Sequence, residues 1–217
     1  MRVNTPPPAP RLKSRWFRAG ASKSAGQQAS AAAFIVWRVA RHSLDRTRRA
    51  GFDVEVGPPY FAFLREVLVF LVALADRVAY ARLGAEGRVA FTGALVHHLA
   101  RILQDNEDDL LGPPAAGAPS HGDSFIDLVN EVTGHYAEFG ADPTVSDAGA
   151  GFHPDFAFLR YLGRRLEPTL PEKDRRWVLD QVMAVEAPEA VAMVQRSLRD
   201  LLDPAAPRAR RTGTTGE

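Results

Sequence analysis

The sequence predicts an all-α protein, a single globular bundle of five to seven helices with a central apolar helix near residues 60–83. Apolar residues recur at helical spacing in several segments, and glycine- and proline-rich stretches separate these segments. No stretch shows the sustained apolar alternation that a half-buried strand requires. The 217 residues, 46% of them hydrophobic and 24% charged, suffice for one domain with its own core. We place that helical domain at residues 29–203.

The two ends of the chain differ from its body in composition and charge. Residues 1–50 hold eleven Arg or Lys and one acid, although the net charge of the whole chain is only +1, so the body is acidic. Before the first apolar segment the chain is rich in proline, serine and glycine and has no apolar periodicity. We therefore expect residues 1–28 to be a disordered basic arm and residues 204–217 a disordered basic tail.

Proline and glycine delimit the first three helices. The first is expected at residues 29–51. Pro58 and Pro59 then stand in the first turn of the second helix, where a proline is tolerated because its missing N–H has no partner to lose. Gly84 ends the second helix, since glycine adopts the left-handed conformation of a helix C-terminus without strain. The third helix covers residues 85–111 and stops at a loop of prolines and glycines.

The remaining helices are shorter. The fourth is expected to run to residue 140, with Asp123 or Ser124 as its N-terminal cap. The fifth covers residues 154–166, and a sixth follows the proline-containing turn after it. Pro188 must kink this last helix or begin a new one, because it cannot donate the hydrogen bond that a helix interior needs.

The second helix is the most apolar segment of the chain. Residues 67–75 are nine consecutive apolar residues, but charged residues flank the run on both sides. A membrane-spanning helix needs about 20 mostly apolar residues, and each charge at mid-span costs about 2.5 to 3.5 kcal/mol. We therefore predict no transmembrane segment and expect this helix to be the most enclosed of the bundle.

Polar residues of this helix gather on one side. At 100° per residue, five of them fall within a sector of about 120°, and apolar residues fill the rest of the circumference. We call this set the polar strip: Arg65, Glu66, Asp76, Arg77 and Tyr80. Buried charges must be partnered. The favoured interpretation is an ion-paired structural strip, and the alternative is a catalytic or ligand-binding site that uses Asp76 or Arg77.

Two helices carry imidazole and carboxylate groups that suit a divalent metal. His98 and Asp105 are separated by seven positions, Glu131 and His135 by four, and both spacings keep the two groups on one helical face. The Glu-x-x-His motif of di-metal bundles is absent, and the acids of the fourth helix lie away from its apolar side. No cofactor is predicted, and a divalent metal is kept as an alternative with these weak candidate ligands: His97, His98, Asp105, Glu131 and His135.

The basic arm interleaves cations with an aromatic ring, a pattern typical of contacts with nucleic acid or an anionic membrane. The candidate contact residues are Arg11, Lys13, Arg15, Trp16 and Arg18. No known nucleic-acid-binding motif accompanies them. Binding would therefore occur through phosphates and depend strongly on salt.

The leading functional hypothesis is a soluble helical interaction protein, an adaptor or regulatory subunit without an evident catalytic site, that binds a protein partner or a second copy. The sequence has no phosphate-binding loop, no zinc-protease motif and no nucleophile elbow. A second hypothesis is a metal- or ligand-binding helical enzyme that uses Asp76, His98 or His135, with Arg77 as a further catalytic candidate. A third is a nucleic-acid-associated protein that binds phosphates through residues 1–28.

The location of the protein is expected to be cytoplasmic. Cysteine is absent, and the basic N-terminal residues are not followed by the apolar core of a signal peptide. Residues 1–28 are also free of acids and contain Arg and Ser, as an organelle transit peptide does, so this alternative stays open.

Overall fold

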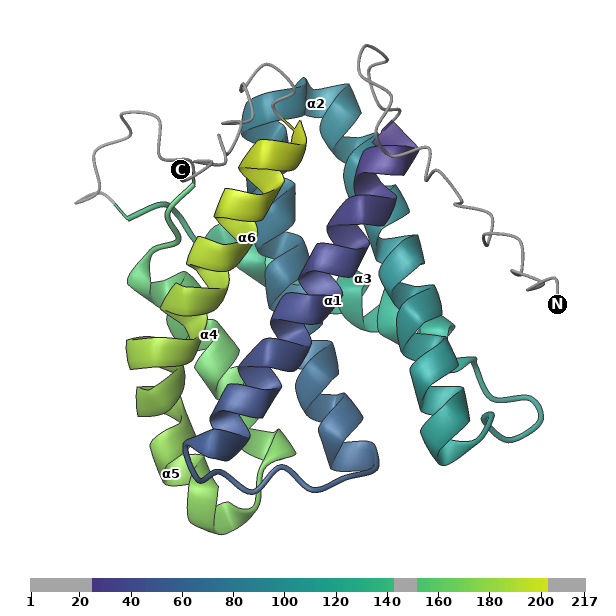
Figure 1. The fold of residues 1–217 in the computed structure, drawn as a ribbon, viewed down its shortest axis with the longest axis vertical. Helices are drawn as coiled ribbons and strands as arrows, with labels where there is room; N and C mark the ends of the chain where they lie inside the picture. Colours follow the sequence, from purple (N-terminus) through teal and green to yellow (C-terminus); the bar gives the residue numbers. More distant parts are fainter. Residues whose placement is uncertain (1–24, 143–151, 203–217) are drawn as a thin grey trace, which may run out of the picture.

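The computed structural model describes residues 25–142 and 152–202 (Figure 1). Their regular elements are all helical, apart from one isolated β-bridge between Ala141 and Pro154. The helices are α1 (Ala25–Arg49), α2 (Pro58–Leu111), α3 (His121–Glu138), α4 (Phe156–Leu166), α5 (Glu172–Gln181) and α6 (Ala187–Leu202), with a 3₁₀ turn η2 (Glu167–Thr169) and a π-helical turn η3 (Val182–Glu186). The predicted all-α bundle is confirmed.

The long element α2 is a helical hairpin. Gly84 interrupts it with φ 67° and ψ −176°, a backbone conformation outside the helical region that suits glycine. Figure 1 shows the two halves of α2 running in opposite directions on either side of this break. Side-chain contacts agree, since Arg65 reaches Glu107 and Asp76 reaches Thr92. The predicted helix end at Gly84 is therefore confirmed.

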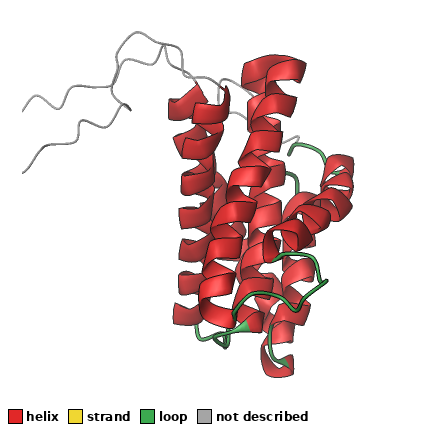
Figure 2. Ribbon diagram, turned by 90° about the vertical axis from the view of Figure 1, so that its right-hand side faces the viewer, coloured by secondary structure: helices red, strands yellow, loops and turns green. Residues whose placement is uncertain are grey.

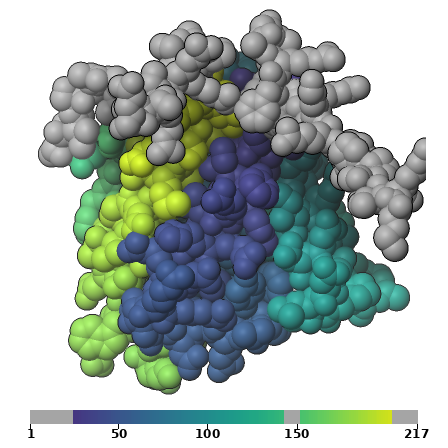
Figure 3. All heavy atoms as spheres, in the orientation of Figure 1, coloured from purple at the N-terminus to yellow at the C-terminus, as the bar shows by residue number. Residues whose placement is uncertain are grey.

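The first half of α2 is enclosed on nearly all sides. Every residue of the range 67–75 is buried. In Figures 1 and 2 most helices follow the long axis of the molecule, whereas α3 crosses α2 on its far side. Figure 3 shows α1 on the front face, between α6 and the second half of α2. The expected central apolar helix is the one observed.

Two helices begin earlier than expected. α1 starts at Ala25, four residues before the predicted start of the domain. α3 starts at His121, and its cap is Ser120, not Asp123 or Ser124. The Ser120 hydroxyl oxygen accepts the backbone N–H of Asp123 at 3.0 Å and donates to the Asp123 carboxylate at 2.8 Å. This reciprocal pairing extends the helix backwards by one turn.

The start of α4 is set by Asp155, so the helix begins at Phe156 and not at residue 154. The Asp155 carboxylate accepts the N–H of Phe158 at 2.8 Å and, through its other oxygen, the N–H of Gly140 at 2.8 Å. One side chain thus caps α4 and holds it beside the end of α3.

Pro188 lies in the first turn of α6, which follows directly on the π turn η3. The N–H of Ala187 donates to the carbonyl of Val182, which is the wider i to i−5 bond. The chain thereby starts a new helix without a loop, and the extra residue of the π turn leaves Glu186 buried, 5% exposed.

The helices of the described ranges include none that combines the length and hydropathy needed to span a bilayer. The arm candidates Arg11, Lys13, Arg15, Trp16 and Arg18 and the tail at 204–217 lie outside the described residues.

Candidate functional site

Glu66, at the first end of the polar strip, is paired with α4. The Arg165 guanidinium donates to both of its carboxylate oxygens, at 2.8 and 2.7 Å. Burial raises the pKa of the Glu66 carboxyl above its ordinary 4.5, and the hydrogen bonds and charge of Arg165 offset part of this rise. This contact is structural, because it fixes α4 against α2, and neither Glu66 nor Arg165 lines the pocket described below.

Arg65, the neighbour of Glu66, joins the two halves of α2. Its guanidinium donates to the two oxygens of Glu107 at 2.9 and 2.6 Å, and His121 Nδ1 lies 3.0 Å from the same carboxylate. Glu107 is only 1% exposed. Acids that crowd the end of a helix are normally solvated, and Glu107 is an exception. Its place one turn after buried Leu103 was a signal of burial in the sequence.

Asp76 lies further along the polar strip and holds the hairpin together near its turn. Arg88 donates to its two oxygens at 2.8 and 2.6 Å, and the Thr92 hydroxyl donates at 2.8 Å. The Asp76 carboxylate raises the pKa of Arg88 above its ordinary value, mainly through these hydrogen bonds. The Asp76 carboxylate therefore accepts three hydrogen bonds.

Arg77 stabilises the end of α3. Its Nη2 donates to the carbonyl oxygens of Tyr136 at 3.4 Å, Ala137 at 3.0 Å and Phe139 at 3.0 Å. A cation is favourable there because the carbonyls at a helix C-terminus have no partner within the helix and carry partial negative charge. The guanidinium carbon also lies 5.4 Å from the ring centroid of Phe152.

Asp76 and Arg77 open onto a pocket of about 680 Å³ between the two halves of α2 and α3. This volume is within the range of small-molecule sites, roughly 300 to 1,000 Å³. The wall combines apolar and polar side chains, and the polar groups come from all three helical segments. The lining residues are Val72, Ala73, Asp76, Arg77, Arg88, Thr92, Gly93, Val96, His97, Ile126, Val129, Asn130, Thr133, Gly134, Tyr136 and Ala137.

Two glycines account for part of this space. Gly93 in α2 and Gly134 in α3 both line the pocket, and a Cβ added at either would meet nothing within 4 Å. Glycine inside a helix is less favourable than alanine by roughly 1 kcal/mol, so each glycine was a sequence signal for a special position. The sequence interpretation did not use it.

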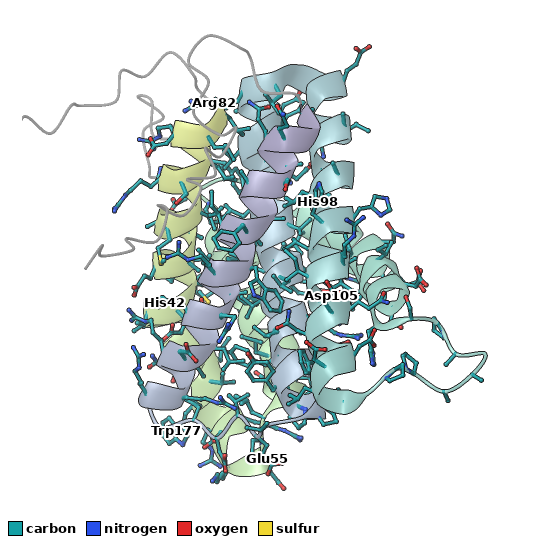
Figure 4. The ribbon with its side chains drawn as sticks, turned by 45° about the vertical axis from the view of Figure 1, so that its right-hand side comes forward. His42, Glu55, Arg82, His98, Asp105 and Trp177 are labelled. Carbon is teal, nitrogen blue, oxygen red and sulfur yellow. The ribbon has the colours of Figure 1, made fainter. Side chains whose placement is uncertain are left out.

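The other candidates do not gather at this pocket, except His97, which is exposed at its edge. His98, the next residue, is half-buried and does not line the pocket. Figure 4 shows Asp105 further along α2 from His98. Glu131 is exposed on α3, and His135 Nδ1 lies 2.6 Å from the Tyr161 hydroxyl. Within residues 25–142 and 152–202, no three His, Asp or Glu side chains are grouped as metal ligands would be.

Comparisons with known proteins give no guide to the pocket. No protein-family model matches this sequence, and no curated protein or solved structure is significantly similar to it.

Proposed function

We propose that this protein is a ligand-binding helical protein, whose site is the pocket between α2 and α3. The observation that carries the proposal is the Asp76–Arg77 end of the polar strip, which opens on this pocket while the Glu66 end is closed by α4. A small-molecule site usually combines apolar side chains with fixed polar groups, and this pocket contains both.

The groups at the pocket favour binding over catalysis. Asp76 already accepts hydrogen bonds from Arg88 and Thr92, and Nη2 of Arg77 donates to the α3 carbonyls. A general base must be free to take a proton from the substrate, and a carboxylate held in a two-pronged arginine contact is a poor one. We therefore propose a binding protein and not an enzyme.

A ligand in this pocket would touch both halves of the α2 hairpin, because Ala73 and Val96 come from opposite sides of Gly84. Any difference in affinity between two arrangements of the halves would shift the balance between them. This gives the protein a way to report ligand binding, which suits the regulatory role expected from the sequence. The expected protein partner stays a prediction.

The test is a screen of a small-fragment library containing acids, bases and neutral compounds, observed by ligand NMR on the full chain. Gly134→Leu and Gly93→Leu fill the pocket from its two walls. Both keep or raise the melting temperature, because leucine favours a helix more than glycine does. Gly26→Leu is the matched control, since Gly26 lies in α1, has open space around it and does not line the pocket.

The expected result is a set of fragments that bind the natural chain and the Gly26→Leu variant but neither pocket variant. If every fragment that binds does so equally to all four proteins, or if none binds, the pocket is not a ligand site and the proposal is wrong.

A further inference from the structure

The charges around the pocket select one class of ligand. Among the described residues, the Asp, Glu, Lys and Arg side chains that line it are Asp76, Arg77 and Arg88. Asp76 and Arg88 neutralise each other through two short hydrogen bonds. Within the described residues, the hydrogen bonds of Arg77 go to neutral acceptors, the carbonyls at the end of α3. The partial charge of those carbonyls, about half an elementary charge for a helix end, leaves the lining net positive.

Arg77 also keeps hydrogen-bonding capacity. Its three hydrogen bonds to described residues all come from Nη2. A guanidinium has five N–H groups, so those of Nε and Nη1 are left for another acceptor. Both parallel N–H pairs of a guanidinium include Nη2, so a carboxylate would be held by single charged hydrogen bonds from Nε or Nη1 and not by a two-pronged contact.

The pocket also has a place for an apolar part of the ligand. Ile126 is half-buried and Ala137 is exposed on the α3 side of the wall, and Val96 of α2 adds a small area, being 9% exposed. Burying an apolar chain against such a wall is favourable by about 25 cal/mol for each Å² removed from water.

A cationic ligand fits poorly. It would meet Arg77 and Arg88, while the acid that could attract it, Asp76, already accepts three hydrogen bonds. Two like charges in a partly enclosed site repel each other more strongly than they would in water.

We propose that the ligand is an amphipathic organic monoanion, a carboxylate held by Arg77 with a short apolar chain against the apolar side chains of the α3 wall. This inference rests on the proposed function, because it assigns the ligand class of the same pocket. The carboxylate brings the positive lining close to neutrality, and the chain fills the space beside Gly93 and Gly134.

The test compares three probes of equal chain length, octanoate, octan-1-ol and octylamine, by isothermal titration calorimetry on the full chain. Octanoate is expected to bind at least about tenfold more tightly than octan-1-ol, a factor worth 1.4 kcal/mol. Octylamine is expected not to bind, and acetate, which lacks the chain, is expected to bind far more weakly than octanoate. Gly134→Leu should abolish octanoate binding and Gly26→Leu should leave it unchanged.

Arg77→Gln should remove the preference for octanoate over octan-1-ol. Because Arg77 also stabilises the end of α3, this variant needs a circular dichroism check of its helix content. If it fails to fold, the natural chain decides: raising sodium chloride from 50 to 500 mM should weaken octanoate binding several-fold and leave octan-1-ol unaffected.

Equal affinity for octanoate and octan-1-ol, tighter binding of octylamine, or an octanoate affinity that is unchanged by Arg77→Gln or by salt would overturn the ligand class. If none of the three probes binds but fragments do bind in a way that Gly134→Leu blocks, the class is wrong and the binding function stands. If neither the probes nor the fragments bind, both the ligand class and the proposed binding function are wrong.

Discussion

At one end of the polar strip on α2, Arg65 and Glu66 are closed in by partners from the rest of the bundle, whereas Asp76 and Arg77 at the other end reach a pocket. We call these the closed end and the open end. Both carry one carboxylate in a two-pronged contact with an arginine. The partners differ: Glu66 meets Arg165 of α4, and Asp76 meets Arg88 just beyond the turn of its own hairpin.

This difference shows how one face of a helix can carry structural ion pairs at one end and the residues of a candidate site at the other. At the closed end α4 covers Glu66, and the buried Glu107 of the returning half of α2 pairs with Arg65, so the ion pairs serve the packing. At the open end the hairpin supplies the partner locally, and the groove beside α3 stays uncovered. The comparison therefore predicts that charge removal costs more stability at the closed end than at the open end.

The largest effect is expected from Arg65→Met at the closed end. This variant removes both arginine hydrogen bonds from the Glu107 carboxylate, which is 1% exposed, and leaves His121 Nδ1 at 3.0 Å beside it. Removing one partner of a buried ion pair costs about 3 to 5 kcal/mol of the free energy of unfolding. Urea unfolding of the two proteins measures the loss.

The control is the double variant Arg65→Met with Glu107→Leu, which leaves no unpaired charge behind and should recover much of the lost stability. If Arg65→Met lowers the free energy of unfolding by less than about 1 kcal/mol, the Arg65–Glu107 pair contributes no more than an exposed ion pair does, and the predicted difference between the two ends is wrong.

The hairpin and the polar strip were predictable because both depend on local features of the sequence. Gly84 marks the turn, and helical geometry alone groups Glu66, Asp76 and Arg77 on one face. The partners were not predictable, because Arg165 is 99 positions from Glu66 and reaches it only once α4 has packed. The partner of Glu107 was hidden for the same reason: its place one turn after Leu103 hinted at burial, but only the return of the hairpin brings Arg65 to it.

The candidate site was predicted in part. Asp76 and Arg77 were singled out from the sequence, and both line the pocket. The pocket itself is a gap between two helices, and the spacing of residues along either helix does not define it. The metal candidates failed to gather because faces of separate helices are brought together by packing: Glu131 is exposed on α3, and Asp105 points away from the core on α2.

A smaller effect is expected from Arg88→Met at the open end. The side chains of Asp76 and Arg88 are 18% and 40% exposed, so water screens the pair, and Thr92 stays as a donor to Asp76. The loss in the free energy of unfolding should be about 0.5 to 1 kcal/mol, as for other exposed pairs. A loss as large as that of Arg65→Met, measured by the same urea unfolding, would remove the distinction between the two ends.

The smallest effect is a change with pH and concerns Glu66. Because burial raises the pKa of its carboxyl above 4.5, the folded protein binds this proton more tightly than the unfolded chain does. The contribution of Glu66 to stability is therefore fully present below pH 4.5 and is lost as pH rises through the raised pKa. The free energy of unfolding of the natural chain minus that of Glu66→Gln should fall as pH rises from 4 to 7.

Comparing the two proteins at each pH by urea unfolding cancels the titration of the other carboxylates, which both share. A difference that grows with pH would show that Arg165 lowers the pKa of Glu66 more than burial raises it. In that case the closed end would be held mainly by charge attraction. A difference that falls with pH means that burial under α4 destabilises the ionised form of Glu66 in the folded protein. This behaviour is expected of an ion pair that serves packing and not binding.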